Sequence, residues 1–496
     1  MVEQPEVRQE PAALARGWPL YLLFFFSGMS TLIFEVLWQR QMVWVLGASA
    51  IATTAVLSAF FLGIALGSLL GGRILRLHAR PLLVYAGVEF CIAAWGLIFP
   101  FALEALDAIY PYLVNLPGLA WIRFALAVCL VLPATLCMGA TIPVMNRILS
   151  DRGNTVGLSV SKAYGVNTLG AVLGALLTGF VLLEIFGVRG ALYIASGINA
   201  CIVIIALILA HPSTPRSSAG GSLHVEMRWL FLYGVSGFVT LAFEVLWFRM
   251  LALVTTDSLI TFSIGLAIFL TGLALGSLLF FPLLARRFDG RTIFIITNLG
   301  LVLCGALTLP WIVQLPGLFA DTLGALHNAE SAHAFILKEE FLYIGLVMFF
   351  PTLFMGLAFP AISQWLASRQ YIGRHTGLIY GAGNLGSVAG ATICGLWWIP
   401  DLGLYPTWLL LCALSLGLAL ITMLGSGLWP GWTPKNRFLA ASLWIGCLSL
   451  ALHTFVERQP INHVGTLVMD NDEWVVQESE SDSISMRFKH YVSGPS

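Results

Sequence analysis

The segment Gly28–Arg40, which reads GMSTLIFEVLWQR, occurs a second time at Gly237–Arg249 as GFVTLAFEVLWFR. The next apolar segment is repeated at the same spacing, with GIALGSLL at Gly63–Leu70 and GLALGSLL at Gly272–Leu279. One spacing shared by two separate segments is not expected by chance, and self-similarity of this kind marks a duplicated unit. The sequence therefore indicates two homologous halves.

Two more pairs of segments extend the repeat toward the end of each half. Met138–Pro143 (MGATIP) corresponds to Met355–Pro360 (MGLAFP), and Tyr164–Gly174 corresponds to Tyr380–Gly390. The four segments follow one another in the same order in both halves. The duplication therefore covers whole halves rather than a single motif.

The composition indicates a membrane protein. Hydrophobic residues make up 58% of the 496 residues and charged residues 10%. No soluble fold could bury so large a share of apolar side chains away from water. The formal net charge is zero, so nothing suggests the clustered basic surface of a nucleic-acid-binding protein, and we expect no such partner. The eight cysteines and nine histidines show no metal-ligand spacing, so we expect no metal site.

Apolar segments of membrane-spanning length recur along the sequence, since a hydrocarbon core of about 30 Å needs roughly 20 apolar residues per helix. Six such segments lie in each half, and one more lies near the C-terminus. They predict an all-α polytopic membrane protein of two homologous six-helix bundles plus one extra C-terminal hydrophobic helix. The predicted units are an N-terminal tail (1–17), the first bundle (18–210), a linker (211–228), the second bundle (229–426), the extra helix (437–456) and a polar tail (457–496).

Arginine residues gather in alternate loops of this arrangement. The loops concerned carry Arg73, Arg76 and Arg80; Arg147 and Arg152; Arg216 and Arg228; Arg286, Arg287 and Arg291; and Arg369 and Arg374. Loops rich in Lys and Arg remain in the cytoplasm. We therefore expect a multi-pass protein of a bacterial-type inner (plasma) membrane with a cytoplasmic N-terminus. Because each half has an even number of spans, the halves should be related by an axis along the membrane normal.

Glu35 and Glu244 lie inside the first predicted helix of each half. A carboxylate at membrane depth costs at least ~2.5 kcal/mol unless it is paired, protonated or hydrated. Arg40 and Arg249 follow five positions later, about 140° around a helix, so neither is a good partner for the glutamate on its own helix. Two interpretations remain open for this set: a structural ion-pair network, or a site for protons or a cationic substrate.

Other polar residues within or near the spans extend the list of candidates for a substrate or proton site. Glu89 lies in the middle of a span and has no acidic counterpart in the second half, where Asn298 lies nearby. Asn167 and Asn384 recur near the fifth helices of the two halves, and Lys162 precedes the first of these helices. The asymmetry of Glu89 favours a functional role over an architectural one.

Glycines spaced four residues apart recur in the second and fifth helices of each half. This spacing places small residues on one face of a helix, where the backbones of two helices can approach closely. We interpret them as helix-packing residues rather than as a binding site: Gly63, Gly67, Gly272, Gly276, Gly170, Gly174, Gly386 and Gly390.

The sequence lacks several motifs that are typical of known soluble types of enzyme. It contains no glycine-rich strand-to-helix loop, no P-loop, no HExxH and no nucleophile elbow. We therefore expect no cofactor, and we do not expect the chain to act as an enzyme by itself.

The motifs quoted above give the chain a resemblance to the membrane region of the spermidine synthase-like integral membrane proteins. The resemblance covers roughly Gly17–Leu424. It implies a helical bundle similar to the major facilitator transporters, often fused to a C-terminal aminopropyltransferase-like domain. The glycine-rich, acid-ended cofactor loop of that domain is not present, and Glu473–Ser479 could supply at most its first strands. A count of thirteen spans would place this tail outside the cytoplasm.

Three hypotheses follow from the motifs and the resemblance. The first is a transporter-like protein that moves a small cationic or amphipathic solute along a pathway between the two bundles. The second is a membrane scaffold or anchor for a separately encoded aminopropyltransferase-like enzyme. The third is a membrane-bound transferase whose catalytic domain is absent from this sequence.

Overall fold

The structure is a computed structural model of the chain. It describes residues 17–46, 50–77, 80–113, 119–149, 155–210, 226–252, 259–324, 329–367, 371–425, 446, 466–470 and 473–477. Most of the predicted N-terminal tail and linker, the extra hydrophobic helix apart from Gly446, and most of the polar tail lie outside these residues.

The first half forms a bundle of long helices, one for each predicted span. They are α2 (Trp18–Leu46), α3 (Ala50–Leu77), α4 (Pro81–Leu113), α5 (Leu119–Leu149), α6 (Val156–Leu177) with its π-helical extension η1 (Thr178–Leu182), and α7 (Leu183–Leu209). α2 packs against α6 and α7, and α4 packs against α5 and α7.

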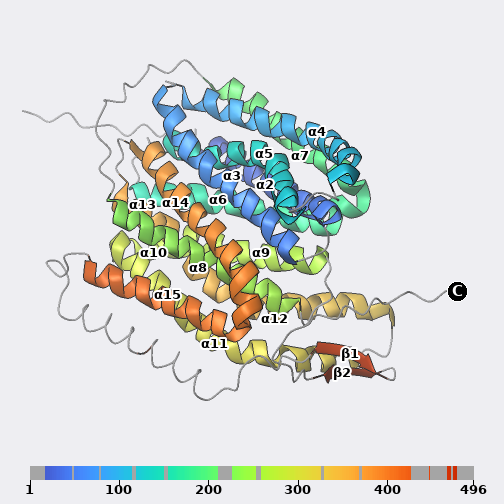
Figure 1. The fold of residues 1–496 in the computed structure, drawn as a ribbon. Helices are drawn as coiled ribbons and strands as arrows, with labels where there is room; N and C mark the ends of the chain where they lie inside the picture. The colour runs from blue at the N-terminus through green and yellow to red at the C-terminus, as the bar shows by residue number, and fades with distance from the viewer. Residues whose placement is uncertain are drawn as a thin grey trace, which may run out of the picture.

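The second half repeats this plan with two further interruptions, in its second and fourth helices. Its helices are α8 (Met227–Leu251); α9 (Leu259–Leu275), η2 (Gly276–Phe280) and α10 (Phe281–Leu284); α11 (Gly290–Gly324); α12 (Ala329–Met355) and α13 (Ala358–Leu366); α14 (Ile372–Ile393) and η4 (Cys394–Leu402); and α15 (Leu404–Gly425). Figure 1 shows the blue-to-cyan helices of the first half above the green-to-orange helices of the second.

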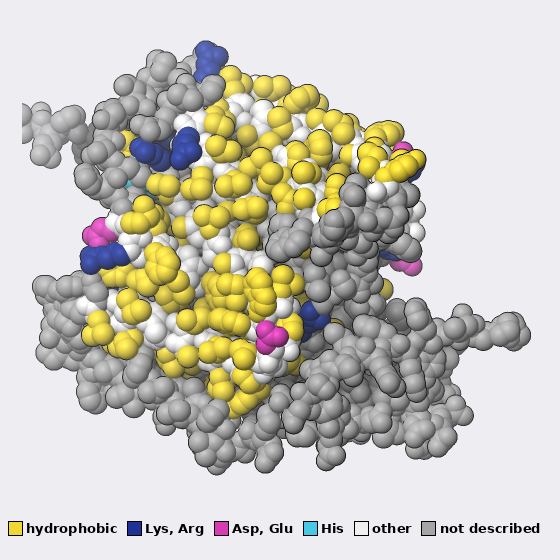
Figure 2. All heavy atoms as spheres, viewed as in Figure 1, with side chains coloured by type: hydrophobic (Ala, Val, Ile, Leu, Met, Phe, Trp, Pro, Cys, Tyr) yellow, Lys and Arg dark blue, Asp and Glu magenta, His cyan; other side chains and the backbone are white. Residues whose placement is uncertain are grey.

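Most of the described helices are long and apolar enough to cross a bilayer. Ten segments meet this condition, and one of them, Val156–Leu209, contains the fifth and sixth helices of the first half. Figure 2 shows hydrophobic side chains over most of the described face, with most charged side chains toward its two ends. Within the described residues, the predicted all-α polytopic membrane fold of two six-helix bundles is confirmed.

One glycine in each half turns the chain near the junction of the fifth and sixth helices: Gly187 at a kink near the start of α7, and Gly403 between η4 and α15. Gly187 has φ 63° and ψ −176°, and Gly403 has φ 86° and ψ 175°. Side chains other than hydrogen disfavour this backbone region. Equivalent turns at equivalent positions show that the duplication extends to the backbone.

A small β-hairpin departs from the all-helical prediction. β1 (Thr466–Asp470) and β2 (Glu473–Gln477) pair antiparallel, with Thr466 opposite Gln477. Both strands contact α11, and Figure 1 shows them at the end of the molecule away from α10 and α13.

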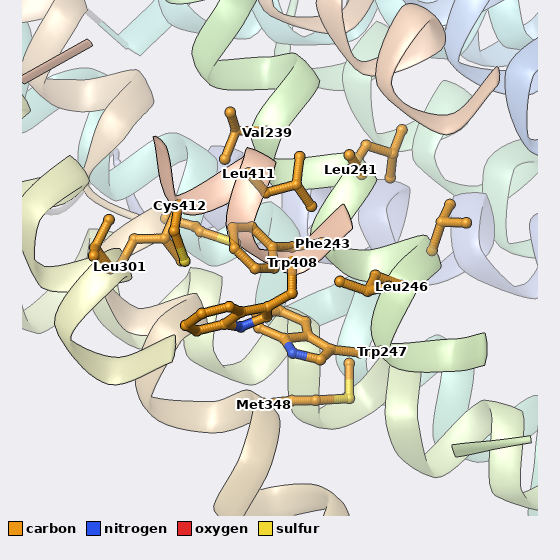
Figure 3. Close-up of a cluster of buried hydrophobic side chains, with 14 of the residues drawn as sticks. Val239, Leu241, Phe243, Leu246, Trp247, Leu301, Met348, Trp408, Leu411 and Cys412 are labelled. Atoms are coloured by element: carbon orange, nitrogen blue, oxygen red, sulfur yellow. The ribbon is translucent and has the colours of Figure 1, made fainter. Parts of the chain in front are cut away.

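The repeated FEVLW motif supplies the core of each bundle. In α2, the rings of Phe34 and Trp38 stack with centroids 5.1 Å apart, and in α8 those of Phe243 and Trp247 stack at 5.2 Å. A spacing of four residues places both rings on one helix face. Figure 3 shows Phe243 and Trp247 next to Trp408 of α15 in the core of the second bundle.

Among the described residues, the largest core that the two bundles share lies at one end of the molecule, and a smaller shared cluster joins Leu32 and Val36 to Leu266. We call the end with the largest shared core the arginine-rich end, because Arg73, Arg80, Arg286 and Arg287 are exposed there. Its core combines side chains of both halves, including Val144, Val160, Phe281 and Phe359. Toward the other end, the main clusters of buried side chains each belong to a single bundle.

Two helix pairs join the bundles along their sides: α3 packs against α14, and α6 packs against α9. Ser58 and Thr392 share a 2.8 Å hydrogen bond across the first pair. Near the arginine-rich end of the second pair, the Ser277 hydroxyl donates to the Ser161 carbonyl at 2.9 Å, and the Ser161 hydroxyl donates in return to the Ser277 carbonyl. Hydrogen bonds therefore link the bundles on both sides of their interface.

Candidate functional site

Glu35 of α2 and Glu244 of α8 come together at the interface between the bundles. Glu35 is partly buried and Glu244 is 5% exposed, and the two carboxylates lie within electrostatic range of each other. Each glutamate follows a core phenylalanine by one position, about 100° around the helix. The aromatic residues of the motif therefore pack inside a bundle while the glutamate points toward the other half.

Two tyrosines complete this site in a crossed arrangement. Tyr164 of α6 lies within electrostatic range of Glu244, which belongs to the other half. Tyr380 of α14 lies within electrostatic range of Glu35, which likewise belongs to the half opposite its own. Because Tyr164 and Tyr380 occupy equivalent positions of the repeat, the site follows the pseudo-twofold symmetry of the chain.

Aromatic rings link the two tyrosines across the interface. The Phe359 ring of α13 contacts Tyr164 edge-on with centroids 5.4 Å apart, and it contacts Tyr380 at 5.2 Å. Tyr233 of α8 lies within electrostatic range of both tyrosines. We call Glu35, Glu244, Tyr164, Tyr380 and Phe359 the interface site.

The candidate arginines do not neutralise the two glutamates. Arg40 is exposed near the end of α2, and Arg249 is half-buried and interacts with Cys394. Among the described residues, no hydrogen bond or ion pair to a basic side chain reaches Glu35 or Glu244. The arrangement can therefore accept positive charge, from a proton or from a cation.

Asn167 and Asn384 lie on equivalent helices but are not equivalent residues. Asn167 donates from Nδ2 to the Phe24 carbonyl at 2.9 Å and so fastens α6 to α2. Asn384 donates to the Tyr380 carbonyl of its own helix at 2.7 Å, and its side chain also interacts with the Tyr380 side chain. Of the two, only Asn384 borders the interface site.

The remaining candidates lie away from the interface site. Lys162 is exposed on α6, near the arginine-rich end. Glu89 is fully buried inside the first bundle, where Oε1 accepts a 2.6 Å hydrogen bond from the Ser27 hydroxyl. The structure therefore separates Glu89 from the interface glutamates.

The candidate glycines of the second and fifth helices all lie against a neighbouring helix. A methyl group at Gly63 or Gly272 would collide with the side chain of Thr135 or Thr352 respectively. At the other six, it would collide with a backbone carbonyl: Gly67, Gly276, Gly170, Gly174, Gly386 and Gly390. Equivalent glycines meet equivalent neighbours, so the close packing is duplicated as well.

The tyrosines are site residues that reasoning from charge alone missed. The signal was present, because Tyr164–Gly165 and Tyr380–Gly381 begin the repeated segments of the fifth helices. A charged residue inside a membrane span indicates a functional role, whereas a tyrosine there can belong equally to the hydrophobic core or to a binding site.

Comparisons with known proteins establish the fold and no closer relationship. No family model and no curated protein matches the sequence, so the spermidine synthase-like resemblance gains no support from them. Among solved structures, the major facilitator proton:xylose symporter XylE, bound to 6-bromo-6-deoxy-D-glucose, matches with a TM-score of 0.52 and 14% identity over 83% of this chain and 96% of its own. A mutant of the nucleoside transporter NupG matches with a TM-score of 0.49 and 16% identity over 82% and 98%. The chain is a multi-pass membrane protein with a major-facilitator-like fold.

Proposed function

We propose that this protein is a membrane transporter that moves a small organic cation along a pathway between its two bundles. The observation that carries the proposal is the pair of glutamates, one from each half, that lie within electrostatic range of each other with no basic partner among the described residues. The major-facilitator-like fold supports it, because proteins built from two six-helix bundles bind their substrates at this interface.

The chemistry of the interface site favours an amine over a neutral solute. Two carboxylates at membrane depth are stabilised by a counter-charge, and an ammonium group supplies one together with hydrogen-bond donors. The rings of Tyr164, Tyr380 and Phe359 add faces that attract cations, a contact worth about 0.5–2 kcal/mol. A diamine could place one charge near each glutamate.

The shared core at the arginine-rich end supports alternating access. Side chains of both halves pack together at that end, and among the described residues the two largest clusters beyond it are built from buried side chains of single bundles. In this form the two bundles are therefore packed together at the arginine-rich end. If the exposed arginines lie in the cytoplasm, as the orientation rule indicates, the N-terminus is cytoplasmic and the bundles are packed together on that side.

A binding measurement on the purified protein tests the proposal. Putrescine, spermidine and tetramethylammonium serve as cationic probes, with xylose and uridine as neutral controls. We expect at least one cation to raise the melting temperature of the wild type, and we expect the shift to be lost in Glu35→Gln/Glu244→Gln. Glu104→Gln is the matched control, because Glu104 is an exposed carboxylate paired with Arg189. Stabilisation by the neutral solutes alone, or equal cation shifts in the double variant, would contradict the proposal.

The β-hairpin favours a second candidate function, that of a scaffold for an aminopropyltransferase-like enzyme. Under the spermidine synthase-like resemblance, the C-terminal tail could supply at most the first strands of such a domain, and β1 and β2 lie in that tail. Co-purification of such an enzyme with the full chain, lost when residues 466–477 are deleted, would favour the scaffold. Cation transport without an associated enzyme would exclude it.

A further inference from the structure

A second buried polar cluster lies inside the first bundle, apart from the interface site. At its centre is Glu89 of α4, which is 0% exposed and accepts a 2.6 Å hydrogen bond from Ser27 of α2. The Tyr85 hydroxyl, one turn earlier on α4, interacts with the same carboxyl without completing a hydrogen bond to any described residue.

Several buried polar atoms of α4 and α7 have no hydrogen-bond partner among the described residues. They are Oε2 of Glu89, the Tyr85 hydroxyl, the Ser196 hydroxyl and both amide atoms of Asn199. Ser196 and Asn199 belong to α7, which packs against α4, and Ser196 lies against Gly96, two turns beyond Glu89 on α4. Since α4 and α7 run in opposite directions, Asn199 lies one turn closer than Ser196 to the level of Glu89. Buried groups of this kind are normally paired, so the unpaired atoms require an explanation.

The equivalent positions of the second bundle carry no such cluster. The repeat places Ser236, Phe294, Asn298, Cys412 and Ser415 at the positions of Ser27, Tyr85, Glu89, Ser196 and Asn199. Asn298 donates to the Phe294 carbonyl at 2.8 Å, and Ser415 donates to the Leu411 carbonyl at 3.0 Å, both within their own helices. The fold therefore does not need a carboxyl at this position, and Glu89 serves something other than packing.

No basic group compensates Glu89 from the helices packed against it. The titratable groups near it are Tyr85 on α4 and Cys137 on α5. Tyr193 and Cys201 of α7 are on the exposed surface, and on α2 the contact is the neutral Ser27. Among the described residues, Glu89 is therefore a buried carboxyl with hydroxyl neighbours and no counter-charge.

We propose that Glu89, with Ser27 and Tyr85, is a proton-binding site within the first bundle. The carboxylate takes a proton from water to become the acid, and it returns that proton to water when the site opens. The neutral acid gains an O–H donor, whereas the carboxylate only accepts hydrogen bonds. Protonation therefore changes which of the unpaired polar atoms can form a hydrogen bond.

The contact with α2 connects this proton to the interface site. Ser27 precedes Glu35 by eight residues on the same helix, about 12 Å along its axis. Gain or loss of the proton at Glu89 changes the hydrogen bond that holds α2 against α4, and α2 presents Glu35 to the other half. This coupling role rests on the proposed transport function, whereas proton binding itself does not.

Infrared difference spectroscopy of the purified full-length protein, titrated between about pH 5 and about pH 9, tests the site without a transported solute. We expect a carboxylic C=O band that disappears reversibly as the pH rises and that is absent from Glu89→Gln. The same band should remain in Glu35→Gln/Glu244→Gln. In Ser27→Ala it should move to higher frequency, because the hydrogen bond is lost.

Two results would overturn the proposal. One is a spectrum of Glu89→Gln identical to that of the wild type over the whole titration. The other is a Glu89 band that does not change with pH, which would make Glu89 a permanently protonated structural residue. Should Glu89→Gln fail to fold, the shift of the titrating band in Ser27→Ala decides the assignment. Failure of cation binding with an intact Glu89 titration would count against the proposed transport function alone.

Discussion

At the scale of single residues, the FEVLW motif combines two roles on one helix turn. Its phenylalanine and tryptophan are stacked in the core of each bundle, while its glutamate lies at the interface between them. The membrane-depth glutamates were predicted from the sequence because a charge in an apolar span is conspicuous. Their mutual proximity was not predicted, since it depends on how the two halves pack.

The stacked tryptophans should contribute strongly to stability. Trp38→Ala removes a fully buried ring that also stacks on Phe99 at 5.1 Å. Large-to-small changes at such positions destabilise proteins by about 3–5 kcal/mol, so we expect a clear fall in the melting temperature of the detergent-purified protein. Trp18→Ala, on the same helix but 65% exposed, is the control and should leave the melting temperature nearly unchanged. Equal effects of the two variants would contradict the assigned core role.

At the scale of helices, close packing depends on glycine at repeated positions. Within the two bundles, helix order and these glycine faces could be predicted from the sequence, because hydropathy and spacing encode them directly. The π-helical segments η1 and η4 could not. They begin at Thr178 and Cys394, equivalent positions of the fifth helices, and no residue pattern distinguishes a π-helical turn from an α-helical one.

Substitution of the fifth-helix glycines should separate helix pairs. A methyl group at Gly170 would collide with the Phe25 carbonyl of α2, and one at Gly386 would collide with the Gly234 carbonyl of α8. We expect Gly170→Ala and Gly386→Ala each to destabilise the protein by about 1–3 kcal/mol, measured as a fall in melting temperature.

Gly197 provides the matched control for this prediction. It lies in α7, and a methyl group there would meet nothing within 4 Å. Because alanine favours helix over glycine, Gly197→Ala should be neutral or slightly stabilising. A loss of stability in Gly197→Ala as large as in Gly170→Ala would show that helix contact is not the cause.

At the scale of the whole molecule, the two bundles meet through a shared core at one end and through paired helices along their sides. A transporter of this design must separate the shared core in part of its cycle. The reciprocal hydrogen bonds between Ser161 and Ser277 lie near that end and join α6 to η2. These hydrogen bonds therefore help to hold the two bundles together at the arginine-rich end.

A cross-link at this contact should stop transport reversibly. We expect Ser161→Cys/Ser277→Cys, in a background without the native cysteines, to form a disulfide under oxidation and to lose cation flux. Reduction should restore the flux, and each single-cysteine variant should remain active under oxidation. Full flux in the oxidised, cross-linked protein would show that the arginine-rich end does not need to open.

Uptake of labelled putrescine, spermidine or tetramethylammonium into proteoliposomes tests most directly the claim that a cation passes between the bundles at Glu35 and Glu244. We predict saturable uptake of at least one of these cations by the wild type and by Glu104→Gln. Glu35→Gln/Glu244→Gln should lose at least about tenfold in uptake, equivalent to about 1.4 kcal/mol. Wild-type uptake in the double variant would contradict the account, as would the absence of cation uptake by the wild type.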